Sequence, residues 1–372
     1  MIERLIQNQI ETRLADKKAI VLYGPRQSGK TTLLEAVMKD RERLWLSGDE
    51  FDVRANFAQP NRDKLKRLVG SYSFVVIDEA QRIPEIGLAI KMLIDQVKTV
   101  KVLASGSSSF ELANQVNEPL TGRKWEFQLW PLSFAELAKH FGSLQEKRVL
   151  ENRLIFGSYP EIITSQSNQK EAIVSLAESY LYKDLLAFER IQKPEKIQVL
   201  LRALAYQIGS EVSFHELSQM CSLDKETVER YIQLLEKSFV IFRLPSFQKN
   251  LRNELKKSKK IYFVDNGIRN AIINQFAPLD ARNDVGALWE NYLMSERMKR
   301  HFYAGSGVNS YFWRTVSQQE IDLVEEHDGV VDAFEFKWNA QRKTKFHKAF
   351  VDAYAPSRTD IITPENYDDF LL

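Results

Sequence analysis

The chain has 372 residues, of which 44% are hydrophobic and 27% are charged, with a formal net charge of +2. This composition is typical of a globular protein of two to three domains, and the weak net charge provides no overall field for nucleic acid. No apolar run is long enough to span a bilayer, and Cys221 is the only cysteine, which excludes an intrachain disulfide and a cysteine metal cluster. We expect a cytoplasmic protein without membrane contact.

The first predicted strand is the apolar run AIVLY at residues 19–23, and the segment GPRQSGKT after it matches G-x-x-x-x-G-K-[ST] at every fixed position. The glycines let backbone N–H groups point toward phosphate oxygens, and the helix that follows directs its positive end to the same anion. Lys30 can contact the terminal phosphates, and the Thr31 hydroxyl is suited to bind Mg²⁺ as a ligand. The sequence predicts a nucleoside triphosphate site made of Gly24, Pro25, Arg26, Gln27, Ser28, Gly29, Lys30, Thr31 and Thr32.

Two acids follow the predicted strand at residues 73–77. In open α/β sheets the carboxyl ends of the strands carry the ligand site. We therefore expect Asp78 to hold Mg²⁺, directly or through water, and Glu79 to polarise the water that attacks the phosphate. The alternative is an acidic turn between a strand and a helix.

The next strand, at residues 101–104, ends in SGSSS at residues 105–109. These hydroxyls either sense the terminal phosphate or form an ordinary turn. Arg123 precedes the predicted strand at residues 125–130. It would stabilise charge on the transferring phosphate, in its own subunit or in a neighbour's, or it is a solvated turn arginine.

These motifs resemble the AAA-type P-loop ATPases and, more narrowly, the prokaryotic ATPases that carry a C-terminal domain of unknown function. The resemblance rests on the phosphate loop, VVIDEA, SGSSS and the TGR–PLSF segment, and it extends to FGSYPE, YKDL and KIYFVDNG at residues 156–161, 182–185 and 260–267. It implies binding of ATP and ADP, a requirement for Mg²⁺, and ATP hydrolysis.

Residues 133–206 have the pattern of helices that form a lid or connector. Ser213 and Glu216 then form a capping box before a short helix, and Asp224 caps a second helix that leads to a strand at residues 239–242. This order predicts a winged helix-turn-helix. Its second helix exposes Glu226 and Glu229, whose charge disfavours DNA, so packing against protein is favoured over base reading. The basic segment at 249–260 is either a nucleic-acid contact or a solvated linker.

Beyond it, a helix starts at residue 286, and two strands at 320–324 and 330–338 are joined by a turn at Asp328 and Gly329. Phe334, Phe336 and Trp338 alternate with Glu335 and Lys337, which places the two polar residues on one face of the strand.

This hairpin resembles the PD-(D/E)XK nuclease-like fold. The resemblance implies that Asp322 and Glu335 bind a second Mg²⁺, that Lys337 positions the attacking water and that Glu290 completes the site. Ile321 occupies the place of the motif's proline. The alternative is an amphipathic hairpin with a salt-bridged solvent face.

The predicted fold is α/β, with an AAA-like P-loop parallel sheet at 1–135, a helical lid at 136–205, a winged helix-turn-helix at 206–250 and a PD-(D/E)XK-like domain at 251–372. We expect an ATPase with catalytic residues Lys30, Glu79 and Arg123. Its hydrolysis of ATP would move the later domains. The alternatives are an ATP-gated nuclease acting on DNA or RNA and a slow nucleotide switch that scaffolds a partner protein. A homo-oligomer is also possible.

Overall fold

The computed structural model describes residues 1–97, 100–106, 119–165, 167–179, 194–248, 259–341 and 345–372. The chain forms two compact units. The first consists of Met1–Pro131 with Lys237–Phe239, and the second consists of Leu132–Glu236 with Val240–Leu372.

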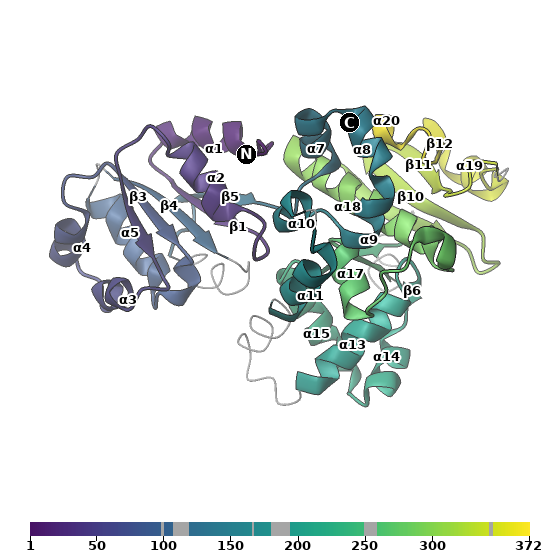
Figure 1. Cartoon of the computed structure of the whole chain (residues 1–372), viewed down its shortest axis with the longest axis horizontal. Helices are drawn as coiled ribbons and strands as arrows, with labels where there is room; N and C mark the ends of the chain where they lie inside the picture. The colour runs from purple at the N-terminus through teal and green to yellow at the C-terminus, as the bar shows by residue number, and fades with distance from the viewer. Residues whose placement is uncertain (98–99, 107–118, 166, 180–193, 249–258, 342–344) are drawn as a thin grey trace. The chain divides into compact units, whose positions relative to one another are not determined.

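The first unit is built on a parallel sheet (Figure 1). Its five strands lie in the order β2-β3-β4-β1-β5. Their bounds are β1 Ala19–Tyr23, β2 Arg43–Ser47, β3 Phe74–Asp78, β4 Lys101–Gly106 and β5 Lys124–Gln128. Every residue of β1 and β4 is buried, as the continuous apolar runs indicate. The predicted α/β class and its parallel P-loop sheet are confirmed.

Helices precede the first strand and connect the others. They are α1 Gln7–Thr12, α2 Lys30–Val37, α3 Phe51–Phe57, α4 Arg62–Val69 and α5 Ile86–Gln96, with 3₁₀ turns η1 Arg13–Ala15 and η2 Ala80–Arg82. The helix α2 begins directly after Gly29, whose φ of 92° lies in the left-handed region that glycine tolerates best. The phosphate loop therefore opens onto a helix N-terminus, as the motif requires.

The second unit begins with helices, as the sequence pattern predicts. They are α7 Phe134–Phe141, α8 Ser143–Arg148, α9 Leu150–Phe156, α10 Pro160–Thr164, α11 Gln169–Ser179 and α13 Pro194–Tyr206. Ser133 and Glu136 form a reciprocal capping box at the start of α7. The YKDL segment at 182–185 lies outside the described residues.

A small antiparallel sheet and two helices follow. They are β6 Glu211–Val212, α14 Phe214–Cys221, α15 Lys225–Lys237, β7 Ile241–Pro245 and β8 Lys259–Phe263, with strand order β6-β8-β7. Ser213 caps α14 by accepting from the Glu216 N–H at 3.3 Å, and Asp224 accepts from the Thr227 N–H at 2.7 Å. The strand expected at 239–242 starts at Ile241, because Phe239 has a left-handed backbone with φ of 59°. These elements fit the predicted winged helix, whose assignment stays a prediction.

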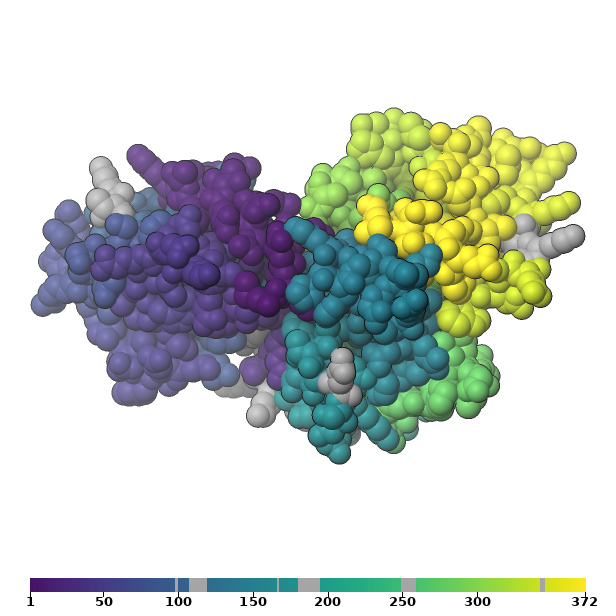
Figure 2. Space-filling view, turned by 45° about the horizontal axis from the view of Figure 1, so that its top comes forward, coloured from purple at the N-terminus to yellow at the C-terminus, as the bar shows by residue number. Residues whose placement is uncertain are grey.

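The rest of the second unit is a four-stranded sheet flanked by helices. Its elements are α17 Asn266–Ile272, η4 Leu279–Ala281, α18 Val285–Ala304, β9 Asn309–Arg314, β10 Glu320–His327, β11 Val330–Phe336, α19 Lys348–Tyr354, β12 Arg358–Ile362 and α20 Tyr367–Leu371. The strand order is β12-β11-β10-β9, antiparallel except for the parallel β11–β12 pair. In Figure 2 the C-terminal residues, in yellow, lie beside the blue surface of α8, where Lys147 Nζ is 2.8 Å from Asp368 Oδ1.

Two of the segments that carry the family resemblance meet in the interior of this unit. Asp265 accepts from the backbone N–H groups of Ser158 at 2.7 Å and Ile268 at 3.2 Å. A Cβ on Gly157 would lie 2.0 Å from a carboxylate oxygen of Asp265, and one on Gly267 would lie 2.1 Å from the Phe156 carbonyl oxygen. Both glycines are therefore needed for close packing, which gives FGSYPE and KIYFVDNG a structural role.

A buried ion pair connects α18 to β10 in the second unit. Arg297 donates to both oxygens of Glu325, at 2.7 and 2.6 Å, and to the Phe370 carbonyl at 2.6 Å. Burial raises the pKa of Glu325, but the bonds from Arg297 and His301 outweigh it and lower the pKa to about 2. Because the pKa of Glu325 is lower in the folded protein than in the unfolded chain, ionisation of this carboxylate stabilises the fold at pH values above its unfolded pKa. This contribution is lost as the pH falls toward 2.

We therefore expect Glu325→Gln to lower the free energy of unfolding at pH 7 by roughly 3 kcal/mol, and by much less at pH 3. Pulsed hydrogen exchange of α18 peptides across a urea series measures this directly. Asp328→Asn is the matched control, because its side chain is 89% exposed in the turn after the same strand. An equal loss at both pH values would show that the carboxylate charge of Glu325 does not provide this stability.

Candidate functional site

The phosphate loop occupies the carboxyl end of β1 and leads into α2. Lys30 is only 6% exposed, and its amine donates to the loop's own carbonyls, at 3.0 Å from Gly24 and 2.8 Å from Pro25. Ser28 Oγ donates to the Pro25 carbonyl at 2.8 Å. A Cβ on Gly24 would lie 2.2 Å from the Leu129 carbonyl oxygen, so only glycine fits there. The loop is thus preformed, with the amine held at its mouth.

Asp78 connects the loop to the neighbouring strands. Its Oδ2 accepts from the Thr31 hydroxyl at 2.7 Å, and its Oδ1 accepts from the Ser105 hydroxyl on β4. Strand β3 ends at this carboxylate, two strands away from β1. A hydroxyl and a carboxylate oxygen are the donor types that Mg²⁺ takes beside a bound triphosphate. The predicted pair of Thr31 and Asp78 therefore fits a magnesium ion.

Glu79 stands at a strained position directly after β3. Its backbone is left-handed, with φ of 48° and ψ of 41°, which is uncommon for a residue with a side chain. Its Oε2 accepts from the Gln81 amide at 2.6 Å. A Cβ on Gly48 would lie 2.3 Å from the Glu79 carbonyl oxygen, so glycine leaves room for this turn. Strain of this kind persists where surrounding contacts fix the backbone, and it is concentrated at functional sites.

Sequence reasoning missed an arginine that supports the loop. The Arg4 side chain is 6% exposed and donates to the Ser28 carbonyl and to the Trp130 carbonyl, each at 2.6 Å. It therefore ties the phosphate loop to the chain that leaves β5. A buried arginine just before α1 has no sequence signal of its own, because its partners are carbonyl oxygens distant in the chain.

The structure separates Arg123 from the phosphate loop. Strands β1 and β5 are parallel, with Ala19 beside Lys124 and Tyr23 beside Gln128. Arg123 therefore precedes β5 at the edge of the sheet opposite to the loop, where it pairs with Asp95 at 3.0 Å. A role in its own subunit is excluded by this strand direction, whereas a role in a neighbouring subunit stays a prediction.

The SGSSS segment is only partly described. Ser105 bonds to Asp78 and is fully buried, so it positions the carboxylate rather than facing a phosphate. Residues 107–109, which complete the predicted sensor, lie outside the described residues.

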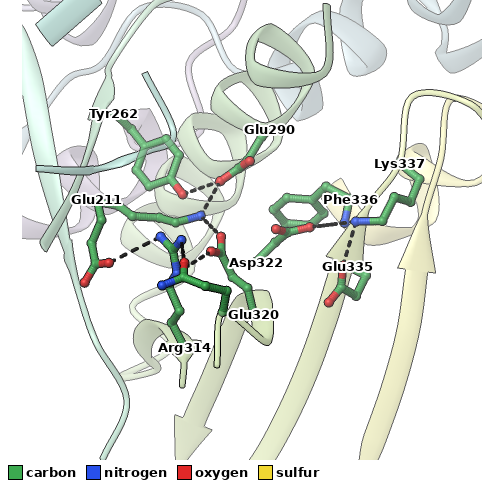
Figure 3. A network of polar contacts seen from close by, with 11 residues as sticks. Glu211, Tyr262, Glu290, Arg314, Glu320, Asp322, Glu335, Phe336 and Lys337 are labelled. Carbon is green, nitrogen blue, oxygen red and sulfur yellow. Dashed lines mark hydrogen bonds and ion pairs between the residues drawn. The ribbon is translucent and has the colours of Figure 1, made fainter. Parts of the chain in front are cut away.

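The second candidate site, in the second unit, contains two amines among its carboxylates (Figure 3). Glu290 Oε1 accepts from the Lys260 amine at 3.0 Å and from the Tyr262 hydroxyl at 2.6 Å. Burial raises the pKa of Glu290, and the charge of Asp322 adds to this effect. Burial lowers the pKa of Lys260, but the surrounding carboxylates outweigh it and the pKa stands well above its ordinary value.

The other half of this site lies at the end of β11. Lys337 Nζ is 2.6 Å from Glu335 and 3.3 Å from Asp322, and Asp322 also accepts from the Phe336 N–H at 2.7 Å. Burial and the neighbouring Asp322 raise the pKa of Glu335 to about 7. The structure thus places Asp322, Glu335 and Lys337 together, as predicted from the hairpin.

The arrangement of these acids does not suit a metal ion. Within the described residues, no group of three or more histidine, cysteine, aspartate or glutamate side chains could hold one. Instead, Lys260 contacts Glu290 while Lys337 contacts both Asp322 and Glu335. The predicted second magnesium site is therefore not formed in this arrangement.

Three sequence families match successive parts of the chain. An AAA domain matches residues 16–138, the domain of unknown function DUF8612 matches 147–279, and the domain of unknown function DUF4143 matches 285–370. The last two descriptions assign no activity, so neither confirms a nuclease-like domain. In the portion of the chain that the structure describes, no helix is both long and apolar enough to cross a bilayer.

The chain is also similar to whole proteins. An uncharacterized protein of Mycobacterium tuberculosis is 27% identical over 323 residues, covering 86% of this chain and 70% of the relative. An uncharacterized protein of Methanocaldococcus jannaschii is 23% identical over 358 residues, covering 86% of this chain and 75% of that relative. The solved Walker-type ATPase PABY2304 of Pyrococcus abyssi aligns with 73% of this chain and 96% of its own, at 15% identity and a TM-score of 0.51. At that identity the likeness shows a shared fold.

Proposed function

We propose that this protein binds ATP with Mg²⁺ and hydrolyses it, a proposal supported by the match of residues 16–138 to an AAA domain. The observation that carries the proposal is the 2.7 Å bond between the Thr31 hydroxyl and Asp78 at the mouth of a preformed phosphate loop. The metal would be held by these two side chains and by phosphate oxygens, and it would offset the phosphate charge.

We assign each chemical step of ATP hydrolysis to a side chain of the first unit. When a triphosphate enters, Lys30 exchanges the Gly24 and Pro25 carbonyls for oxygens of the terminal phosphates. The backbone N–H groups from Arg26 to Thr32 hold the remaining oxygens. Glu79 orients the attacking water and accepts its proton, and Gln81 positions the Glu79 carboxylate. The products are ADP and phosphate.

We further propose that nucleotide turnover changes what the second unit presents to a partner. Support comes from the order of the family matches, since two further domains follow the ATPase domain in the same chain. A slow nucleotide switch that scaffolds a partner protein is the alternative from the binding class.

Cleavage of nucleic acid is a second candidate function. It is favoured by the convergence of Glu290, Asp322, Glu335 and Lys337 in one polar network, and opposed by the amines between those carboxylates (Figure 3). Nucleic acid therefore remains a proposed partner of the second unit.

The test compares the wild type with Asp78→Asn. Calorimetry measures Mg-ATP binding, and phosphate release is measured alone, with single-stranded DNA and with double-stranded DNA. We expect turnover in the wild type and a loss of at least about tenfold in Asp78→Asn, because a metal ligand is removed. Stimulation by DNA together with strand cutting would support the nuclease candidate. Failure of the wild type to bind ATP would refute the central proposal.

A further inference from the structure

Lys260 is the most enclosed charged group of the polar network in the second unit. It is 1% exposed, on β8, and its amine lies 3.0 Å from Glu290 and 2.5 Å from Glu320. The amine also lies 5.6 Å from the centre of the Phe312 ring, a distance at which a cation is attracted to an aromatic face. Two carboxylates and a ring face therefore surround one ammonium group.

This amine joins three parts of the second unit. Strand β8 belongs to the small sheet with β6 and β7, Glu290 lies on α18, and Glu320 begins β10 of the four-stranded sheet. Arg314 extends the network, with contacts to Glu320 at 3.4 Å and to Glu211 at 3.3 Å. Figure 3 shows Arg314 between these two acids, and Tyr262 pointing to Glu290. The network is thus an ionic connection between two sheets.

The same amine already occupies the position that a divalent cation bridging Glu290 and Glu320 would take. A metal ion that used Glu290 and Asp322 would need carboxylate oxygens at about 2.0 to 2.6 Å, and it would come close to a buried positive charge. The Glu290 oxygen that faces the amine is already shared with the Tyr262 hydroxyl. A charge that is buried among carboxylates is costly to remove, so the ammonium group holds its place.

We propose that Lys260 is the resident cation of this acidic site and that it excludes divalent metal from it. The second unit then keeps its acids neutralised by its own lysines and holds its two sheets together without a metal ion. The site would take a divalent cation only when Lys260 is removed or withdrawn. This inference concerns the second unit and does not depend on nucleotide binding by the first unit.

The experiment removes the lysine and measures metal binding. All proteins carry Asp78→Asn, so that the nucleotide site does not contribute a metal ligand. Lys260→Met is compared with Lys299→Met, a matched control that removes another lysine of 1% exposure, paired with Glu296 at 2.7 Å. Mn²⁺ binding is measured by calorimetry, and the melting temperature is recorded with and without Mn²⁺.

We expect Lys260→Met to bind Mn²⁺ at least about tenfold more tightly than the parent and Lys299→Met, and to melt higher with Mn²⁺ present. Adding Glu290→Gln to Lys260→Met should abolish the gain. Equal binding by the parent and Lys260→Met would overturn the proposal, as would an absence of binding in both. If Lys260→Met does not fold, Lys260→Gln is used in its place, because glutamine retains a hydrogen-bond donor for Glu290. Tight Mn²⁺ binding by the parent that Asp322→Asn abolishes would also refute the exclusion.

Discussion

Lys30→Ala is expected to reduce ATP turnover at least about a hundredfold, the usual loss when a group that stabilises transition-state charge is removed. In the structure the Lys30 amine lies within 3.0 Å of two carbonyls of the phosphate loop, and we expect it to bind the terminal phosphates when ATP is present. Removal of this positive charge leaves the phosphate oxygens without their counter-ion. Phosphate release under saturating Mg-ATP measures the loss, and calorimetry shows how much of it comes from weaker binding.

The control for this variant is Lys39→Ala, an exposed lysine just after α2 in the same unit. It should keep wild-type turnover and affinity. A well-folded Lys30→Ala protein with wild-type affinity and turnover would refute the role of Lys30 in the nucleotide site.

Glu79→Gln separates binding from hydrolysis. Glutamine keeps the size and hydrogen-bonding capacity of the side chain, so its contact with Gln81 survives, but it cannot accept a proton. Mg-ATP should bind as in the wild type, while hydrolysis should fall by about 10² to 10⁴, the usual contribution of a positioned general base. Single-turnover phosphate release measures the chemical step apart from ADP release.

The control for Glu79 is Glu85→Gln, which changes an acid that precedes α5 with the same left-handed backbone, at φ of 54°. It should leave hydrolysis unchanged. If Glu79→Gln hydrolyses ATP at the wild-type rate, then Glu79 has only a structural role at its turn and another group orients the water.

The sequence by itself determined the nucleotide half of this protein, because its signals are local. The phosphate loop needs glycine, lysine and threonine at fixed spacing within one strand–loop–helix unit, and Asp78 follows a continuous apolar strand. Such features are set by neighbours in the chain, so pattern and structure agree. The proximity of Asp322 to Lys337 was also expected from the sequence, because Asp322 lies on β10 and Lys337 directly follows β11, the strand paired with β10.

Only the tertiary structure decided which residues from distant parts of the chain lie together. The direction of β5 beside β1 placed Arg123 away from the loop, and strand order brought Ser105 to Asp78. Arg4 contacts the loop at Ser28, which is 24 residues away in the chain, and Lys260 contacts Glu290, which is 30 residues away. A lysine in a basic stretch and a lysine buried among acids have the same sequence signature. Their difference arises from which strands pack together, and that is fixed by long-range contacts rather than by spacing.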